Sequence, residues 1–148
     1  MNLEDALKLR QGKKLVFTNG VFDILHAGHV QYLAEARKLG ELLIVGVNTD
    51  DSVRMLGKGP NRPVNHLDDR IAVLEALRVV DGAVAFPERT PEELIKKLRP
   101  EVHVKGGDYA IEDLPEAKIA QAYGGQVILI PFLPGRSTTS IIERLRDE

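Results

Sequence analysis

The segment TNGVFDILHAGHVQYL carries two histidines, His26 and His29, with Gly28 between them, where a β-branched run gives way to helical spacing. Histidines so placed can cap a helix and pack, bind zinc, or move a proton. They can also hold phosphate, because the free N–H groups and the dipole of a helix N-terminus favour an anion. No third strong zinc ligand stands nearby, which disfavours a metal site. The spacing alone leaves the other three interpretations open.

A second candidate anion site lies near the end of the chain, in GRSTTSII. Gly135 and Arg136 precede three hydroxyl side chains, Ser137, Thr138 and Thr139, and an apolar run at helical spacing follows. One hydroxyl is enough to cap a helix. Three hydroxyls with an arginine therefore favour phosphate binding at a helix N-terminus. The spacing is not that of a P-loop, and no dinucleotide-binding glycine fingerprint follows the first predicted strand.

Two basic residues lie in the stretch MLGKGPNRPVN, which we predict to be a loop because glycines and prolines recur in it. Lys58 and Arg62 lie within it, and Arg70 and Arg78 stand eight residues apart in the segment that follows, where they could share a helix face. Charges of this kind are often only solvated. A loop bearing Lys and Arg beside an anion site would also neutralise the charge of a polyphosphate.

The stretch HVKGGDY ends a predicted strand with two glycines and then an acid. Gly107 favours a tight turn that exposes backbone groups, and Asp108 would stand at the edge of the sheet. A plain turn from strand to loop explains the pattern equally well. Lys105 precedes the glycines and adds a cation at the same edge.

The elements that must position these residues alternate along the chain. Five continuously apolar runs predict strands covered on both faces. Between them, Thr90 and Glu93 form a capping box pattern, Asn65 can cap another helix, and the helix after HAGH is expected to end at Gly40. The predicted strands are 14–19, 42–48, 82–86, 101–106 and 126–132, with an N-terminal helix within 1–13 and a last helix over 138–146.

This alternation predicts an α/β fold: one Rossmann-like, doubly wound domain over residues 1–148, with a core of about 14–148. Its sheet would have five parallel strands flanked by helices. Ligands of such sheets bind beyond the carboxyl ends of the strands, where the strand order reverses. Each polar motif above follows a predicted strand, so we expect them at one edge of the sheet.

Composition excludes several classes of function. Twenty Lys and Arg face 22 Asp and Glu, so no overall positive field attracts nucleic acid or an anionic membrane. The chain has no cysteine, which excludes disulfides and thiolate chemistry. Its apolar runs are far shorter than the roughly 20 residues of a membrane helix, and no signal sequence is recognisable. We expect a cytoplasmic protein without nucleic-acid or membrane partners.

Taken together, HAGH and GRSTTSII resemble the two signatures of the HxGH nucleotidyltransferases, which include small cytidylyltransferases and the cores of class I aminoacyl-tRNA synthetases. The stretches TNGVFDILHAGHVQYLAEARKLG, LIVGVNTD, RPVN, VKGGDY and STTSII are similar to the adenylyltransferase domain of the bacterial ADP-heptose pathway. The resemblance runs from about Lys14 to the C-terminus. That family often has Cys where this chain has Val21. No kinase-sized segment is present, so the sequence resembles the stand-alone form of the enzyme.

The resemblance implies a reaction in which D-glycero-D-manno-heptose 1-phosphate and ATP give ADP-heptose and pyrophosphate, for lipopolysaccharide core or related glycan synthesis. The sugar phosphate attacks the α-phosphorus in line and is already ionised, so positioning and charge stabilisation suffice. It also implies Mg²⁺ on the substrate phosphates and a homodimer. Two alternatives remain: a cytidylyltransferase acting on glycerol 3-phosphate or a similar alcohol phosphate, and a nucleotide-binding module without turnover.

Residue roles are likewise implied by the resemblance. His26, His29 and Lys58 would be catalytic, holding the ATP phosphates and stabilising the transition state. Asp23 would meet the sugar or the metal, and Arg62 the sugar phosphate or pyrophosphate. The nucleotide, its phosphates and the sugar would be recognised by Thr18, Asn19, Gly20, Phe22, Gly28, Lys105, Gly107, Asp108, Arg136, Ser137, Thr138 and Thr139.

Overall fold

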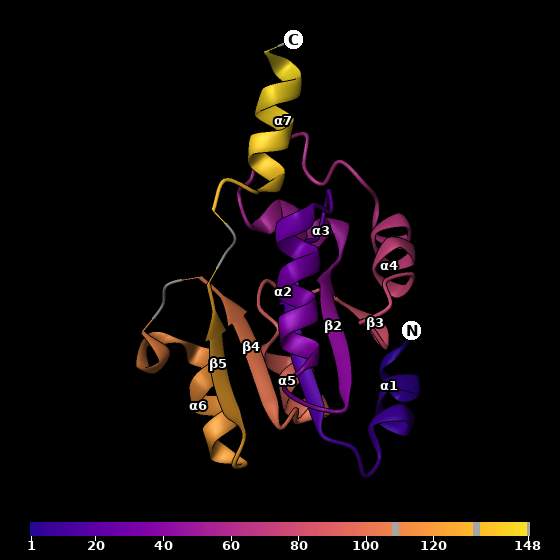
Figure 1. Ribbon diagram of the computed structural model, residues 1–148, viewed down its shortest axis with the longest axis vertical. Coiled ribbons are helices and arrows are strands. Elements are labelled where there is room, and N and C mark those ends of the chain that lie inside the picture. The colour runs from indigo at the N-terminus through magenta and orange to yellow at the C-terminus, as the bar shows by residue number, and fades with distance from the viewer. Residues whose placement is uncertain (108–109, 132–133, 148) are drawn as a thin grey trace.

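The computed structural model describes residues 1–107, 110–131 and 134–147, and its strands form one parallel sheet in the order β3-β2-β1-β4-β5 (Figure 1). The predicted five-stranded parallel α/β fold is confirmed. The predicted fifth strand ran to residue 132, which lies outside the described residues. The strands are β1 (Leu15–Gly20), β2 (Leu42–Asn48), β3 (Gly82–Phe86), β4 (Val102–Gly106) and β5 (Gln126–Ile130).

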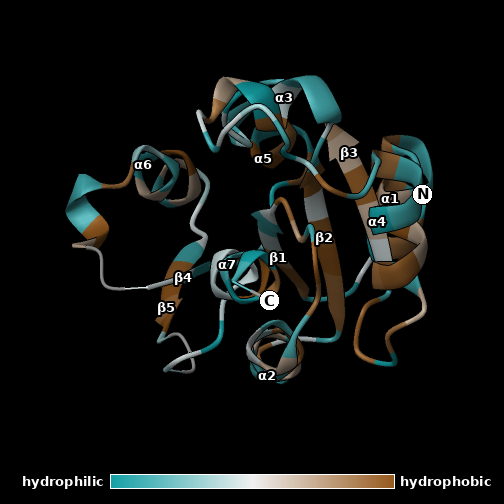
Figure 2. Ribbon diagram, turned by 90° about the horizontal axis from the view of Figure 1, so that it is seen from above, coloured by the Kyte–Doolittle hydropathy of each residue, from teal (hydrophilic) through white to brown (hydrophobic). Residues whose placement is uncertain are grey.

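Helices cover both faces of the sheet, which explains why its strands are continuously apolar (Figure 2). Val16 faces a core built with two helices on one side, whereas Leu15 and Phe17 face a core on the other side. The first core includes α2 (Ala27–Arg37) and α4 (Leu67–Glu75), and the second includes α1 (Leu3–Arg10) and α5 (Glu92–Leu98). The remaining helical elements are α3 (Asp50–Met55), η1 (Ile111–Asp113), α6 (Pro115–Ala122) and α7 (Thr138–Arg146).

The predicted capping box of α5 is wrong. The helix begins at Glu92 and its N-cap position is Pro91, with no hydrogen bond from a capping side chain. The Pro91 carbonyl accepts the first helical hydrogen bond, from the Ile95 N–H at 2.9 Å, so the helical frame starts one residue later than a Thr90 cap requires. Glu93 therefore does not pair with Thr90 as predicted.

The predicted ends of two other helices also need correction. His66, not Asn65, occupies the N-cap position of α4. The Asn65 side chain instead donates a hydrogen bond to the Asp23 carbonyl at 2.6 Å, a long-range contact that local capping signals do not reveal. Helix α2 ends at Arg37 rather than Gly40, because Gly40 donates back to the Arg37 carbonyl in a tighter turn.

The strand order places β1 at the point where the chain switches from one side of the sheet to the other, between β2 and β4. The carboxyl ends of β1 and β4 therefore stand side by side. Helix α2 starts just above this point, and α7 stands above the same edge (Figure 1). The Thr138 hydroxyl ties the start of α7 to this region by donating to the Ile24 carbonyl at 2.9 Å.

Candidate active site

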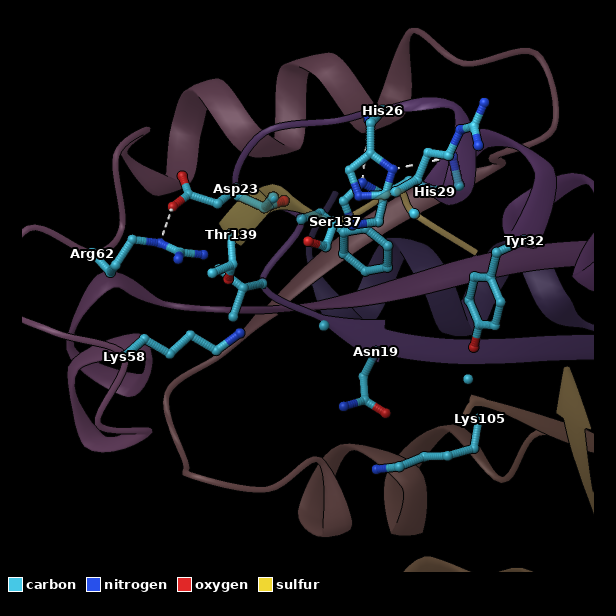
Figure 3. A pocket seen from close by; sticks show the side chains of 18 of the residues that line it. Asn19, Asp23, His26, His29, Tyr32, Lys58, Arg62, Lys105, Ser137 and Thr139 are labelled. Carbon is cyan, nitrogen blue, oxygen red and sulfur yellow. Dashed lines mark hydrogen bonds and ion pairs between the residues drawn. The ribbon is translucent and has the colours of Figure 1, made fainter. Parts of the chain in front are cut away.

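A cavity of about 530 Å³ opens beyond the carboxyl ends of β1 and β4, at the predicted switch point (Figure 3). Segments far apart in the sequence meet around it: the turn after β1 with the start of α2, the loop before α4, the end of β4, and the start of α7. The cavity is lined by Asn19, Gly20, Val21, Phe22, Asp23, His26, Gly28, His29, Tyr32, Lys58, Arg62, Lys105, Gly106, Pro134, Gly135, Arg136, Ser137, Thr138 and Thr139.

The two histidines cap α2 with the same ring atom. His26 Nδ1 accepts the Gly28 N–H at 3.1 Å, and His29 Nδ1 accepts the His26 N–H at 3.3 Å. In a neutral imidazole one nitrogen accepts while the other donates, so both rings carry their proton on Nε2. Within the described residues neither Nε2 has a protein partner. Capping and phosphate binding are thus compatible, since capping uses Nδ1 and leaves two Nε2–H donors for a ligand.

The neighbours of these rings fix their positions. The His26 and His29 centroids lie 3.9 Å apart, and Phe22 packs 5.3 Å from His29. Gly28 makes this possible, because a Cβ there would lie 2.8 Å from the His26 ring. Phe22 itself adopts φ +50°, a conformation rare for an aromatic residue, and its ring folds over Gly20. Strain of this kind concentrates at functional sites.

Electrostatics keep the histidines neutral near pH 7. Burial, followed by repulsion from a protonated His26 and from Lys58, lowers the pKa of His29 to about 4. Burial also lowers the pKa of His26. The pKa of Lys58 is lowered by burial and by Arg62. A neutral imidazole is a hydrogen-bond donor through Nε2–H but a very weak acid, and the Nδ1 that could act as a base is taken by the cap in both rings, which argues against acid–base work.

Asp23 anchors the basic loop, by which we mean residues 56–66. Its side chain is fully buried and accepts hydrogen bonds from Arg62 Nε at 2.9 Å, the Val64 N–H at 2.8 Å and the Asn65 N–H at 2.8 Å. Both carboxylate oxygens are therefore occupied by the loop. Figure 3 shows Lys58 extending from this loop into the cavity.

Arg70 does not extend the basic face as predicted. Its guanidinium is buried and donates to the carbonyls of Val21, Asn48 and Asn65, and it pairs with Asp50 at 2.7 Å. The predicted face shared with a second arginine is wrong for a further reason, since α4 ends at Glu75, before that arginine. Arg70 instead cross-links the turn after β1, the end of β2 and the basic loop.

The three hydroxyls at the start of α7 divide their tasks. Ser137 is the N-cap and accepts the Ser140 N–H at 3.0 Å, while Thr138 donates to the Ile24 carbonyl. Thr139 lines the cavity, and its hydroxyl has no protein hydrogen bond within the described part of the chain. The helix N-terminus and Thr139 together supply donors that capping does not consume.

Comparison with known proteins identifies the family. The model of the family described as cytidylyltransferase-like matches residues 17–144, nearly the whole chain. The chain belongs to the cytidylyltransferase-like family. The resemblance to HxGH nucleotidyltransferases is thereby confirmed.

Individual relatives of this family member are also similar over long stretches. A protein from Bordetella bronchiseptica named D-beta-D-heptose 1-phosphate adenylyltransferase is 54% identical over 137 residues, 93% of this chain and 85% of the relative. A bifunctional protein HldE from Ectopseudomonas mendocina is 53% identical over 146 residues, 99% of this chain and 30% of HldE. The chain thus spans less than a third of the HldE protein it matches.

Among the solved structures that resemble this cytidylyltransferase-like chain are the following two. A lipopolysaccharide core biosynthesis protein from Thermoplasma volcanium is 32% identical with a TM-score of 0.67, over 82% of this chain and 98% of that one. A pantothenate synthetase from Thermus thermophilus is 14% identical with a TM-score of 0.62, over 96% and 68%. The second likeness shows the fold alone.

Most of the described residues predicted to form the site line one cavity, but Thr18 and Gly107 do not. Thr18 is buried behind it, hydrogen-bonded to the Tyr32 hydroxyl. Gly107 lies just beyond the lining residue Gly106, with φ +109°. Asp108 lies outside the described residues. The predicted roles of these three residues remain predictions.

Some residues that line the cavity were not predicted from the sequence, Tyr32 among them. Tyr32 stands three residues after His29, so helical spacing could have placed it on the same face. Its hydroxyl donates to the Val104 carbonyl at 3.1 Å, and burial raises the pKa of Tyr32 to about 12. Val21, Gly106 and Pro134, which offer no chemical signal of their own, also line the cavity, as does Gly135 of the second candidate anion site.

The described cavity is a poor fit for a metal held by the protein. The described residues include no group of three or more His, Cys, Asp or Glu positioned to bind a metal ion. Asp23 is the only carboxylate in the described lining, and both its oxygens accept hydrogen bonds from the basic loop. These residues therefore offer Mg²⁺ no free carboxylate.

The length and composition of each helix also decide whether it could cross a membrane. None of the helices within the described ranges has the length and apolar composition to cross a membrane.

Proposed function

We propose that this chain is a nucleotidyltransferase that transfers AMP from ATP to D-glycero-D-manno-heptose 1-phosphate, giving ADP-heptose and pyrophosphate. One observation carries the proposal: two outward Nε2–H donors and a free helix N-terminus meet at one cavity, in a chain 54% identical to a heptose 1-phosphate adenylyltransferase. ADP-heptose would serve lipopolysaccharide core or related glycan synthesis.

In the proposed reaction a phosphate oxygen of the sugar phosphate forms a bond to the α-phosphorus of ATP. The bond from that phosphorus to the bridging oxygen of the β-phosphate breaks, and pyrophosphate leaves. The attacking oxygen is already ionised, so no enzyme group must remove a proton. The protein's task is to align the two phosphates and to stabilise the charge that builds on the α-phosphate and the leaving group.

The described residues supply these functions from three sides. His26 and His29 would donate their Nε2–H groups to phosphate oxygens, and because the rings are neutral they stabilise charge by hydrogen bonding. The N-terminus of α7, with Thr139 and Arg136, would hold the β- and γ-phosphates. Lys58 would add a positive charge from the basic loop.

The remaining lining residues would recognise the nucleotide and the sugar. Asn19 and Lys105 stand at the carboxyl ends of β1 and β4, opposite the basic loop (Figure 3). Arg62 lines the cavity, and only its Nε is engaged by Asp23 among the described residues. Its terminal nitrogens would meet the sugar phosphate. Asp23 is then an anchor for the loop rather than a ligand for the sugar or a metal.

Three further parts of the proposal concern Mg²⁺, the oligomeric state and the cellular location. Mg²⁺ would be held by the substrate phosphates and water, as this ion prefers in phosphoryl transfer. The chain would form a homodimer, which the helix α7 supports because none of its residues is buried and Leu145 is 66% exposed. The enzyme would work in the cytoplasm, where ATP is available.

A pyrophosphate-release assay tests the function. ATP and CTP are each paired with the anomers of heptose 1-phosphate and with glycerol 3-phosphate. The proposal expects fast release with ATP and one heptose anomer. Preference for CTP and glycerol 3-phosphate would support the alternative cytidylyltransferase, and nucleotide binding without release in any combination would support a module without turnover. Either result overturns the proposal.

A further inference from the structure

One buried histidine has no part in the function proposed above. His103 lies on β4 with no exposed surface, and its ring packs 5.4 Å from Phe17. Its Nε2 lies 3.3 Å from Oδ1 of Asn19, a residue that lines the cavity. Its Nδ1 is buried without a hydrogen-bond partner in the described part of the chain. A buried polar atom left unpaired is costly, so its retention calls for a reason.

The contact with Asn19 fixes where the His103 proton sits. An amide oxygen can only accept a hydrogen bond, so Nε2 must carry the hydrogen and donate it. Burial lowers the pKa of His103 to about 4, so the ring is neutral near pH 7 and Nδ1 is a bare acceptor. The other tautomer would instead bury an unpaired N–H donor at Nδ1, which is rarer in proteins than an unpaired acceptor.

The same contact fixes the orientation of the Asn19 amide. With Oδ1 held by His103, the NH₂ group points away from that ring. Asn19 stands at the cavity edge beside Lys105 (Figure 3), where the proposed substrates would bring anionic oxygens. An amide turned the other way would offer its oxygen to an anion and repel it. The orientation therefore decides whether Asn19 attracts or repels the ligand.

We propose that His103 is a positioning residue for substrate binding: through Nε2–H it holds the Asn19 amide with its NH₂ donors facing an anionic oxygen of the bound nucleotide. The identity of that ligand rests on the proposed function. His103 itself never touches the substrate. The ring packs against Phe17, so a packing role alone would be filled by an apolar side chain without an orphaned nitrogen.

A double-mutant cycle separates positioning from packing. Gln places an amide NH₂ near the position of Nε2–H, whereas Leu fills similar space without a donor. We expect His103→Leu to weaken ATP binding about tenfold, the scale of losing one well-placed hydrogen bond to a charged group, and His103→Gln to recover most of it. In an Asn19→Ala background, His103→Leu should cause no further loss, because its effect passes through Asn19.

Binding is measured by calorimetry with ATP and turnover by pyrophosphate release, so that effects on KM and kcat are separated. His66→Gln is the matched control, since that histidine is exposed and lies outside the cavity, and it should bind ATP as the wild type does. Unchanged ATP affinity in His103→Leu, or the same tenfold loss in both backgrounds, overturns the proposal. So does a folded His103→Gln variant that binds as poorly as His103→Leu.

A measurement on the unmodified chain covers the case in which His103→Leu does not fold. Nitrogen-15 spectra of the histidine rings distinguish the two neutral tautomers, and His103 must be protonated on Nε2. Protonation on Nδ1 would refute the proposal without any variant. If the wild type binds ATP but makes no ADP-heptose, the proposed function fails, while the ATP-binding cycle still decides the role of His103.

Discussion

Asp23 and Arg62, 39 residues apart in the chain, form an ion pair of 2.9 Å in which the Asp23 side chain is wholly buried and the Arg62 side chain is only 11% exposed. The pair joins the turn before the HxGH residues to the basic loop that carries Lys58. Two backbone N–H groups of the loop, from Val64 and Asn65, complete the carboxylate's hydrogen bonds. The loop is thus held by Asp23 in its C-terminal half, while Lys58 extends from its N-terminal half into the cavity.

Replacing this carboxylate by an amide should release the loop. Asp23→Asn keeps the shape but removes the charge and turns an NH₂ group toward N–H donors. Breaking a buried ion pair on one side costs on the order of 3 kcal/mol. We therefore expect a lower free energy of unfolding in urea, faster proteolysis within residues 56–66, and kcat/KM reduced at least about tenfold.

The matched control is Asp51→Asn, which breaks the pair of Asp51 with Arg54 on the surface, where the Asp51 side chain is 90% exposed. Exposed pairs contribute little, so stability and activity should stay close to those of the wild type. Equal effects of the two substitutions, or a normal Asp23→Asn enzyme, would mean that the buried pair does not hold the loop.

His29 should be needed for turnover. His29→Ala removes an Nε2–H donor from the cavity together with the acceptor of the His26 N–H. Loss of one preorganised charge-stabilising donor lowers kcat by roughly 10²-fold or more. Steady-state kinetics measure the effect, circular dichroism checks the fold, and His66→Ala outside the cavity serves as the control. Near-normal turnover in a folded His29→Ala enzyme would exclude the proposed catalytic role.

Stability should depend on pH through the buried histidines. The pKa of His103 falls from 6.5 to about 4 on folding because of burial, so between these values the unfolded chain binds a proton that the folded chain does not. The free energy of unfolding is therefore unaffected by protonation of His103 above pH 6.5. It falls as the pH drops toward 4, by about 3 kcal/mol for this group.

Urea unfolding across this window, in the wild type and in His103→Gln, measures the contribution directly. The variant has no imidazole at position 103 and should show a shallower loss of stability on acidification. His29, whose pKa burial also lowers to about 4, continues to titrate in both proteins and cancels in the comparison. If the free energies of unfolding of the two proteins changed with pH in parallel, His103 would not have a lowered pKa in the folded chain, and the prediction would be wrong.

Much of the fold could be predicted because its signals are local. Strands β2 and β3 were predicted at their observed bounds, since each is an apolar run covered on both faces. Helix α3 was missed because six residues are too few for a periodic pattern. The Asn65 cap failed for a different reason: its side chain is taken by Asp23, a partner 42 residues away that spacing cannot reveal.

The site was predictable to the extent that parallel strands bring their carboxyl ends together. This placed His29, Lys105 and Thr139 at one cavity from separate motifs. Helical spacing shows which residues share a face but not which face turns inward, so the buried Arg70 was mistaken for a surface cation. The contact of His103 with Asn19 was also invisible, because it depends on which strands are neighbours.

The buried guanidinium of Arg70 provides the last test. It donates to the carbonyls of Val21, Asn48 and Asn65 as well as to Asp50, a fan of acceptors that the single ammonium of lysine cannot reach. Arg70→Lys should therefore lower the free energy of unfolding by roughly 3 kcal/mol, because buried carbonyls lose their donors. Arg78→Lys, at an exposed position, is the matched control and should leave the urea midpoint unchanged. A small effect of Arg70→Lys would mean that the turn after β1 and the basic loop are held without this cross-link, and the loop's position would then depend on Asp23 alone.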